Sequence, residues 1–324
     1  MKLGAILLNW RTPDMTIEAL DALVLELRRR TDGWRVVIVD NDSGDGSEEA
    51  LRQAVEDRRR SSALFQNVEV LQSGHNGGFG AGNNFGIRTL LESAHPPDYV
   101  YILNSDAFVE ERCVDALIEQ LDAHPDVGIV GSYVHGVDGE PHVTAFRFPS
   151  IQSEIEGSLR LGVVTRLLRQ YEVPMGIPEH TCEVDWLAGA SMMIRRSVLE
   201  QIGLFDESFF LYFEETDLCR RARRAGHRVV YVKESSVAHI GSASTGMKTW
   251  TKVPDYWFDS RRHYFLKNHG RAYLAAATTA RLAGSAVWQL RRRAQGKADE
   301  DPPGFLGGLL GHSVRYLRRE LTPR

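Results

Sequence analysis

The stretch "WRVVIVDNDSGDGS", residues 34–47, decides the fold. Its first half is a run of β-branched apolar residues, which is typical of a strand buried on both faces. Its second half consists of acidic, amide, hydroxyl and glycine residues, the composition of a loop. A buried strand that ends in such a cluster is typical of the carboxyl edge of a parallel sheet, where open α/β proteins bind their ligands.

Similar segments lie on both sides of this stretch. The patterns predict strands at 2–10, 68–74 and 98–110, and helices at 14–30, 47–60 and 85–94. This alternation predicts an α/β fold with a mostly parallel central sheet flanked by helices. Strands, a hairpin and helices follow less regularly up to residue 232, with loops or a short helix expected at 151–182. Helices are expected from residue 256 to the end, interrupted by a linker at 296–304.

Polar residues follow each of the first four predicted strands. A single cluster of this kind is usually a turn or a helix cap. Four clusters at one edge of a sheet predict a binding crevice there. The clusters are Asn9, then Asp40-Asn41-Asp42-Ser43, then Asn76, then Asn104-Ser105-Asp106.

The glycine-rich stretch "SGHNGGFGAGNNFG", residues 73–86, matches neither common phosphate-binding motif. The third glycine of a dinucleotide fingerprint would fall on Asn83 or Phe85, and no Gly-Lys-Ser/Thr follows. Main-chain amides and asparagine side chains at the start of a helix favour a pocket for a polar, phosphate-bearing ligand. The alternative is a tight turn with helix caps.

The chain has the composition of an ordinary globular protein, and its cysteine usage indicates a reducing compartment. Its three cysteines form no CxxC pair, and no segment has the pattern of a signal peptide or a membrane span. The net charge of −4 is uneven, because residues 271–324 hold ten Lys and Arg against four Asp and Glu. This basic tail either meets an anionic surface or is a solvated appendage.

An ordered set of motifs carries a family resemblance. The set is "NW" at 9–10, "VDNDSGDGS" at 39–47, "NGGFGAGNNFGI" at 76–87, "LNSDAF" at 103–108, "DWLAGASMMIRR" at 185–196, "GLFDESFFLYFEETDLCRRARRAGHRV" at 203–229 and "AHIGSAS" at 238–244. It resembles the inverting nucleotide-sugar glycosyltransferases of family 2, which have a GT-A fold, and among them the bacterial rhamnosyltransferase-like branch. The resemblance implies a catalytic domain over 1–270 and a basic helical extension over 271–324.

The resemblance implies that the strand ends bind a nucleotide-diphosphate sugar donor. Asp40 resembles the acid that accepts the N3–H of a uracil or thymine base, with Asn41 and Asp42 supporting it. Asn9 would lie near the base or the ribose. The other implied donor-binding residues are Asn76, Gly77, Phe79 and Asn83 of the glycine-rich stretch, and Asn104, Ser105 and Asp106 after the fourth strand.

The same resemblance implies a divalent cation, Mg²⁺ or Mn²⁺, at the donor diphosphate. Asn104-Ser105-Asp106 stands where the family often has Asp-x-Asp, so Asp106 would bind the metal. His239 would help to hold the metal or the diphosphate, although a lone histidine is as often structural.

Transfer also requires a general base and a place for the acceptor. The family has this base in an acidic motif that "FEETDL" matches, with Glu215 at the base position, Glu214 as the fallback and Asp217 in a supporting role. The alternative is an ordinary acidic helix N-terminus. Trp186, Gly189 and Ala190 of "WLAGAS" are expected to form the acceptor wall.

The implied function is transfer of a hexose, such as rhamnose from dTDP-rhamnose, to a glycan or polyprenyl-diphosphate-linked acceptor in bacterial surface polysaccharide synthesis. The alternatives are a non-catalytic nucleotide-sugar-binding protein and a nucleotidyltransferase. The enzyme is expected in the cytoplasm or peripherally on the cytoplasmic face of the inner membrane, with no nucleic-acid partner. The tail is expected either to contact that membrane or to pack on the catalytic domain or a second subunit.

Overall fold

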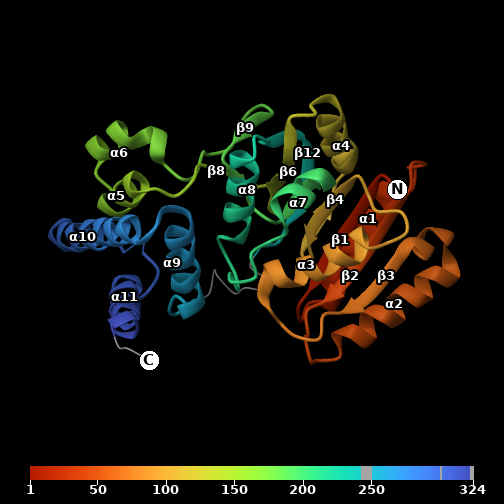
Figure 1. The fold of residues 1–324 in the computed structure, drawn as a ribbon, viewed down its shortest axis with the longest axis horizontal. Helices are drawn as coiled ribbons and strands as arrows, with labels where there is room; N and C mark the ends of the chain where they lie inside the picture. The colour runs from red at the N-terminus through yellow and green to blue at the C-terminus, as the bar shows by residue number, and fades with distance from the viewer. Residues whose placement is uncertain (242–249, 300, 322–324) are drawn as a thin grey trace. The chain divides into compact units, whose positions relative to one another are not determined.

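The computed structural model describes residues 1–241, 250–299 and 301–321, which form two compact units (Figure 1). The first unit comprises Met1–Phe146, Pro174–Phe210 and residues 214–241. The second comprises Arg147–Val173, Leu211–Phe213 and the described residues from 250 onward.

A ten-stranded sheet in the order β3-β2-β1-β4-β11-β6-β12-β5 is the centre of the first unit, with β7 beside β6 and β9 beside β12. A separate pair is formed by β10 and β8. The strands are β1 (Leu3–Asn9), β2 (Trp34–Asp40), β3 (Val68–Gln72), β4 (Tyr99–Asn104), β5 (Ala107–Val109), β6 (Val127–His135), β7 (Pro141–His142), β8 (Ala145–Phe146), β9 (Cys182–Val184), β10 (Trp186–Leu187), β11 (Ser191–Arg195) and β12 (Arg228–His239).

The predicted α/β fold is confirmed. The parallel part of the sheet consists of the first four strands that the sequence pattern predicted. Strands β3, β2, β1 and β4 run parallel. Beyond them β11 is antiparallel to both β4 and β6, whereas β12 is parallel to β6 and antiparallel to β5. The sheet is therefore mixed as a whole.

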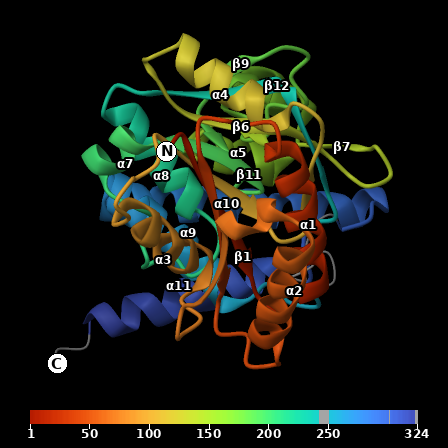
Figure 2. The same cartoon turned by 90° about the vertical axis from the view of Figure 1, so that its right-hand side faces the viewer.

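Helices cover both faces of this sheet because β1 is apolar on both sides. Leu3, Ala5 and Leu7 belong to the main core with α1, whereas Ile6 and Leu8 face glycines of α3. Figure 2 shows α1 and α2 side by side. The helices of this unit are α1 (Pro13–Leu27), α2 (Ser47–Ser61), η1 (Ala63–Asn67), α3 (Gly78–Leu91), α4 (Cys113–Ala123), α7 (Arg196–Ile202) and α8 (Glu214–Arg224).

The second unit is helical in all its described elements. It contains α5 (Ile151–Leu159), α6 (Gly162–Leu168), η2 (Arg169–Tyr171), α9 (Asp255–His269), α10 (Arg271–Gln295) and α11 (Phe305–Leu321). The segment predicted as loops or a short helix thus forms α5, α6 and η2. Within the described ranges, no helix is long and apolar enough to cross a membrane.

The predicted boundary at residue 270 falls inside this helical unit, between α9 and α10. Helix α9 belongs with α5 and α10, because the buried Arg261 forms an ion pair with Glu154 at 2.9 Å and donates to Thr278 at 3.1 Å. Gly284 of α10 lets Ser158 of α5 approach closely, since a Cβ at Gly284 would lie 1.8 Å from the serine hydroxyl.

Candidate active site

The polar strand ends meet at one edge of the sheet. Asn9, the last residue of β1, is in register with Asp40 of β2, and Asp40 is in register with Gln72 of β3. On the other side of β1, Asn104 of β4 is in register with Leu8. The structure therefore brings together the residues that follow all four parallel strands.

Asp40 is a buried carboxylate that receives hydrogen bonds on both oxygens. Its Oδ1 accepts from Asn9 Nδ2 at 2.7 Å and from Ser43 Oγ at 2.6 Å. Its Oδ2 accepts from the Ser43 backbone N–H at 3.0 Å and from Gln72 Nε2 at 2.9 Å. The side chain is only 1% exposed, so a pyrimidine N3–H can reach it only if one of these donors moves away.

Asn9 lies beneath the site instead of facing a ligand. It is fully buried, and its Oδ1 accepts a hydrogen bond from Thr16 Oγ1 at 2.8 Å while its Nδ2 donates to Asp40. Asn9 therefore positions its neighbours here, and its expected contact with the base or ribose stays a prediction. It joins the end of β1, the start of α1 and the carboxylate of β2.

Asn41 connects this edge to the glycine-rich stretch. Its Nδ2 donates to Asn76 Oδ1 at 3.0 Å and to the carbonyl of Gly78 at 3.2 Å. Asn76 Oδ1 in turn accepts from the Gly78 backbone N–H at 3.0 Å. Asp42 is exposed and has a φ of +55°, a conformation that aspartate tolerates. Asn41 and Asn76 thus hold the turn that enters α3.

Most of the glycine-rich stretch is helix, not loop, and α3 begins seven residues before the predicted start. A Cβ on Gly82 would lie 2.5 Å from Leu8 Cδ1, and one on Gly86 would lie 3.0 Å from Ile6 Cγ2. These glycines allow α3 to pack closely on β1. Asn83 is also fully buried, with its Nδ2 donating to the Phe79 carbonyl at 2.9 Å, and its contact with the donor stays a prediction.

Gly78 is required by close approach of the chain. Its φ is +87°, and a Cβ there would lie 1.7 Å from the carbonyl oxygen of Phe210. The next residue, Phe79, donates its backbone N–H to the same carbonyl at 3.0 Å. Gly77, directly before α3, would place a Cβ 2.6 Å from Ala81 Cβ. The Phe79 ring is thereby held at the first turn of α3, where it meets Phe205 edge-on.

Asp106 and His239 form a polar pair close to the end of β4. His239 of β12 lies opposite Ala107 of β5, and its Nε2 is 3.0 Å from Asp106 Oδ1. Asn104 Nδ2 lies 3.4 Å from the same imidazole nitrogen, and Ser105 Oγ is 3.1 Å from Thr12 Oγ1. The predicted triplet and the distant histidine are therefore neighbours.

This pair fits a divalent cation that is shared with a bound diphosphate. A carboxylate oxygen and an imidazole nitrogen are both metal donors, and the described residues contain no group of three or more His, Cys, Asp or Glu that would enclose an ion by themselves. Mg²⁺ is commonly held by one or two carboxylates together with substrate phosphates and water. The donor set therefore fits a metal that binds together with its nucleotide.

Glu215 has the properties of a general base. Burial raises the pKa of its carboxyl from 4.5 to about 7, against an opposing effect of hydrogen bonds from its own backbone N–H and from that of Gly189. Its Oε2 is buried, and none of the described residues donates a hydrogen bond to it. A carboxylate with a pKa near neutrality and an unused oxygen can accept a proton from a hydroxyl group.

The neighbouring acids of α8 differ from Glu215. Glu214 is 1% exposed and packs toward Gly80 of α3, where a Cβ would lie 3.7 Å from its own Cβ. Asp217 is fully buried and forms an ion pair with Arg221 at 2.8 Å. The Arg221 guanidinium also donates to the carbonyls of residues 202–204, so Asp217 and Arg221 together link α8 to the segment that follows α7.

An apolar wall lies beside Glu215. A Cβ on Gly189 would be 2.9 Å from Phe79 Cζ and 3.7 Å from Glu215 Oε1, so Gly189 allows these side chains to come together. Trp186 stacks on Phe146 with ring centroids 4.2 Å apart. Ala190 is buried, and its carbonyl accepts the Asn104 backbone N–H at 3.0 Å, which makes it a link between strands and not part of the wall.

Sequence reasoning missed several residues of the site. Gln72 ends β3 at the same edge as Asp40, so the strand-end argument that found Asn9 would also have found it. Thr12, directly before α1, lies within hydrogen-bond distance of Ser105, and Thr16 in the first turn of α1 donates to Asn9. Phe146 of β8 pairs with Trp186 of β10. No sequence signal marks these three.

Comparisons with known proteins agree with this geometry. The family model described as glycosyl transferase family 2 matches residues 14–203, more than half of the chain. N-acetylglucosaminyl-diphospho-decaprenol L-rhamnosyltransferase of Mycobacterium tuberculosis is 32% identical over 226 residues, which cover 65% of this chain and 68% of that protein. Rhamnosyltransferase WbbL of Escherichia coli is 27% identical over 164 residues, covering 50% of this chain and 60% of the relative.

A solved structure has the same fold at low sequence identity. The mannosyltransferase PcManGT from Pyrobaculum calidifontis, in complex with GDP-Man and Mn²⁺, superimposes with a TM-score of 0.55 and is 16% identical. The match covers 98% of this chain and 87% of that one.

Proposed function

The chain belongs to glycosyl transferase family 2, and from that premise we propose that it transfers L-rhamnose from dTDP-L-rhamnose to a sugar carried on a polyprenyl diphosphate. Glycosyltransfer follows from the family. The sugar and the acceptor are supported by the two rhamnosyltransferase relatives, of which the mycobacterial one is named for a decaprenyl-diphosphate-linked N-acetylglucosamine. We place the reaction in the assembly of bacterial surface polysaccharide, at the cytoplasmic face of the inner membrane.

The observation that carries the proposal is Glu215. It combines a pKa of about 7 with an unused buried oxygen next to the wall formed by Phe79 and Gly189. A protein that only binds nucleotide sugars would have no need of a carboxyl group whose pKa burial raises to about 7. A nucleotidyltransferase would need a basic glycine-rich segment after β1, where this chain has "NWRTPD", residues 9–14.

In the proposed mechanism the acceptor hydroxyl loses its proton to Glu215 Oε2 as its oxygen attacks the anomeric carbon. The new C–O bond forms while the bond from the anomeric carbon to the diphosphate breaks, and the nucleoside diphosphate leaves with the electron pair. Attack opposite to the leaving group inverts the anomeric configuration. A positioned base of this kind contributes roughly 10²–10⁴-fold in rate.

The donor is proposed to lie along the strand-end edge, with the nucleoside near the turn of Asp40, Asn41 and Asp42. Asn76 and Gly77 hold the neighbouring turn into α3. Asp106 and His239 would hold Mg²⁺ or Mn²⁺, which neutralises charge on the diphosphate leaving group. Asn104 would orient His239 through the contact described above, and Ser105 would link this segment to Thr12.

The proposal is tested by a transfer assay with purified protein and Mg²⁺ or Mn²⁺. dTDP-L-rhamnose, UDP-N-acetylglucosamine and GDP-mannose are compared as donors, with N-acetylglucosaminyl diphosphate on a short alkyl chain as the acceptor. We expect a product only with dTDP-L-rhamnose, and no product with Glu215→Gln although donor binding is kept. Transfer by Glu215→Gln at the rate of the unchanged protein would refute the role of this base.

A further inference from the structure

The solvent-exposed side of α10 is almost entirely apolar. All exposed residues of this helix between Arg271 and Arg293 are alanine, threonine, valine or leucine: Ala272, Ala275, Ala276, Thr279, Ala283, Ala286, Val287 and Leu290. At 1.5 Å per residue this strip is about 27 Å long. A surface helix normally turns its apolar side to the core and its charged side to water, so packing within the second unit does not explain the strip.

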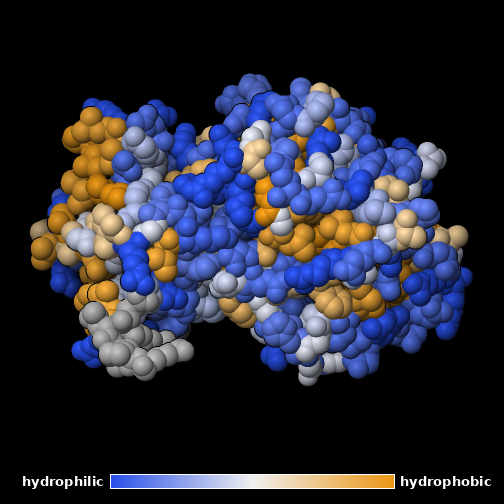
Figure 3. All heavy atoms as spheres, viewed as in Figure 1, coloured by the Kyte–Doolittle hydropathy of each residue, from blue (hydrophilic) through white to orange (hydrophobic). Residues whose placement is uncertain are grey.

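Neighbouring helices extend the strip. On α11 the exposed residues Leu310, Val314 and Leu317 recur at helical spacing, and on α6 Val163 and Leu167 are 70% and 74% exposed. Figure 3 shows apolar residues gathered over α6 and α10. We call the strip on α10, together with these five residues, the apolar face.

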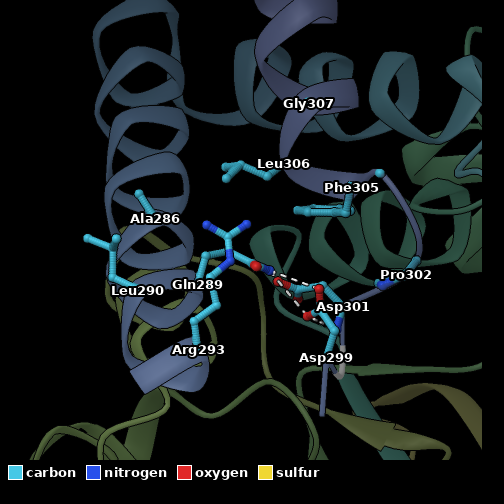
Figure 4. A pocket seen from close by; sticks show the side chains of 11 residues that line it. Ala286, Gln289, Leu290, Arg293, Asp299, Asp301, Pro302, Phe305, Leu306 and Gly307 are labelled. Atoms are coloured by element: carbon cyan, nitrogen blue, oxygen red, sulfur yellow. Dashed lines mark hydrogen bonds between the residues drawn. The ribbon is translucent and has the colours of Figure 1, made fainter. Parts of the chain in front are cut away.

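A cleft joins the parts of this face on α10 and α11. Its volume is about 480 Å³, and Ala286 and Leu290 of α10 line it together with Leu306 and Gly307 of α11 (Figure 4). Arg293 lines the same cleft. The acidic groups of the cleft are bound by basic ones, Asp299 by Arg292 at 3.0 Å and Asp301 by Arg160 at 2.8 Å. The exposed apolar residues of α10 and of α11 therefore lie on the two sides of one cleft.

The charges of α6, of α10 and of residues 305–319 of α11 are all positive. Neither α6 nor α10 contains an Asp or Glu, and none occurs between residues 305 and 319. The exposed arginines include Arg166 on α6, Arg293 on α10 and Arg318 on α11. If two copies of the chain met through this face, arginines would approach arginines, which is unfavourable. An anionic lipid surface satisfies both the apolar side chains and the positive charges.

We propose that the apolar face docks on the surface of an anionic phospholipid bilayer, with its leucines and valines among the acyl chains and its arginines at the phosphates. The physiological meaning rests on the proposed function, because docking would bring the enzyme to a lipid-linked acceptor. The binding itself requires neither donor nor acceptor, and so it can be tested separately.

The experiment is co-sedimentation of the full chain with vesicles of phosphatidylcholine alone or of phosphatidylcholine and phosphatidylglycerol in equal amounts. Leu290→Glu and Leu317→Glu are compared with Leu25→Glu. The control is matched, because Leu25 and Leu317 are both 58% exposed and Leu25 lies on α1 of the first unit. Binding of dTDP-L-rhamnose by each variant is measured in the same preparations as a check on the first unit.

We expect binding to the phosphatidylglycerol vesicles that each substitution on the apolar face weakens by about tenfold or more, whereas Leu25→Glu leaves it unchanged. Equal binding to both kinds of vesicle, or equal loss in all three variants, would overturn the proposal. A dimer in solution that Leu290→Glu dissociates would also overturn it, because the face would then join two copies. Failure of transfer with intact vesicle binding would count against the proposed function alone.

Discussion

Replacing Glu215 with glutamine is expected to remove activity and at the same time to stabilise the protein at alkaline pH. The carboxyl has a pKa of 4.5 when exposed and about 7 in the fold, because burial disfavours its charged form. Between these values the unfolded chain releases its proton while the folded chain keeps it. The free energy of unfolding therefore falls as pH rises from 4.5 to 7, and the loss is complete above 7.

The size of this effect follows from the pKa difference. A shift of one pKa unit corresponds to about 1.4 kcal/mol, so the rise from 4.5 to about 7 corresponds to about 3 kcal/mol. Glutamine is neutral at every pH and avoids the cost of burying a charge. Glu215→Gln should thus unfold with a free energy up to about 3 kcal/mol higher than the unchanged protein at pH 8, and with no difference near pH 4.

The assay is urea unfolding of both proteins at several pH values, together with the pH dependence of the transfer rate. The rate should rise with pH up to about 7 and then level off, because the base must be ionised. Glu207→Gln is the control, because the fold shifts the pKa of Glu207 in the opposite direction. A hydrogen bond from Asn84 lowers the pKa of Glu207, so this variant should lose stability at pH 8 and none at low pH. Equal stability of Glu215→Gln and the unchanged protein at pH 8, with a transfer rate independent of pH, would refute the reasoning.

Three further substitutions test the site, and a fourth serves as a control. Asp106→Ala should abolish the rise in Tm that Mn²⁺ adds in the presence of dTDP-L-rhamnose, and an undiminished rise would exclude this carboxylate as a ligand. Gly189→Ala places a Cβ 2.9 Å from the Phe79 ring, so we expect a transfer rate lowered by about tenfold and an almost unchanged Tm. Gly78→Ala combines a φ of +87° with an overlap at 1.7 Å and should cost at least about 2 kcal/mol of unfolding free energy. Gly74→Ala, with a φ of +78° and open space, shows in the same urea titration how much of that cost is backbone strain alone.

The sequence predicted the parallel half of the sheet and the position of the site because both depend on local patterns. An apolar run followed by Asp40 or Asn104 is visible along the chain, and parallel pairing then brings such ends together. The buried state of Asn9 and Asn83 was not predictable, because polar strand-end residues look alike whether they face a ligand or hold a turn. The grouping of α9 with α5 also depends on a contact between distant residues, Arg261 and Glu154.

The glycine-rich helix explains how one element can serve both halves of the proposed reaction. At its start, Gly78 is tied to Asn41 and Asn76 at the edge proposed for the donor. Directly after it, Phe79 and Gly80 contact the segments that carry the base, through Gly189 and Glu214 respectively.

The small residues that follow fix this helix against the sheet. Gly82 and Gly86 allow α3 to lie directly on Leu8 and Ile6 of β1. The packing of α3 on β1 therefore fixes the positions of both the edge proposed for the donor and the proposed base. A larger residue at Gly82 would push the helix outward and displace both contacts together. We therefore expect Gly82→Ala to weaken donor binding and to slow transfer, whereas Gly189→Ala should slow transfer alone. Equal donor affinity in both variants would show that the position of α3 does not affect donor binding.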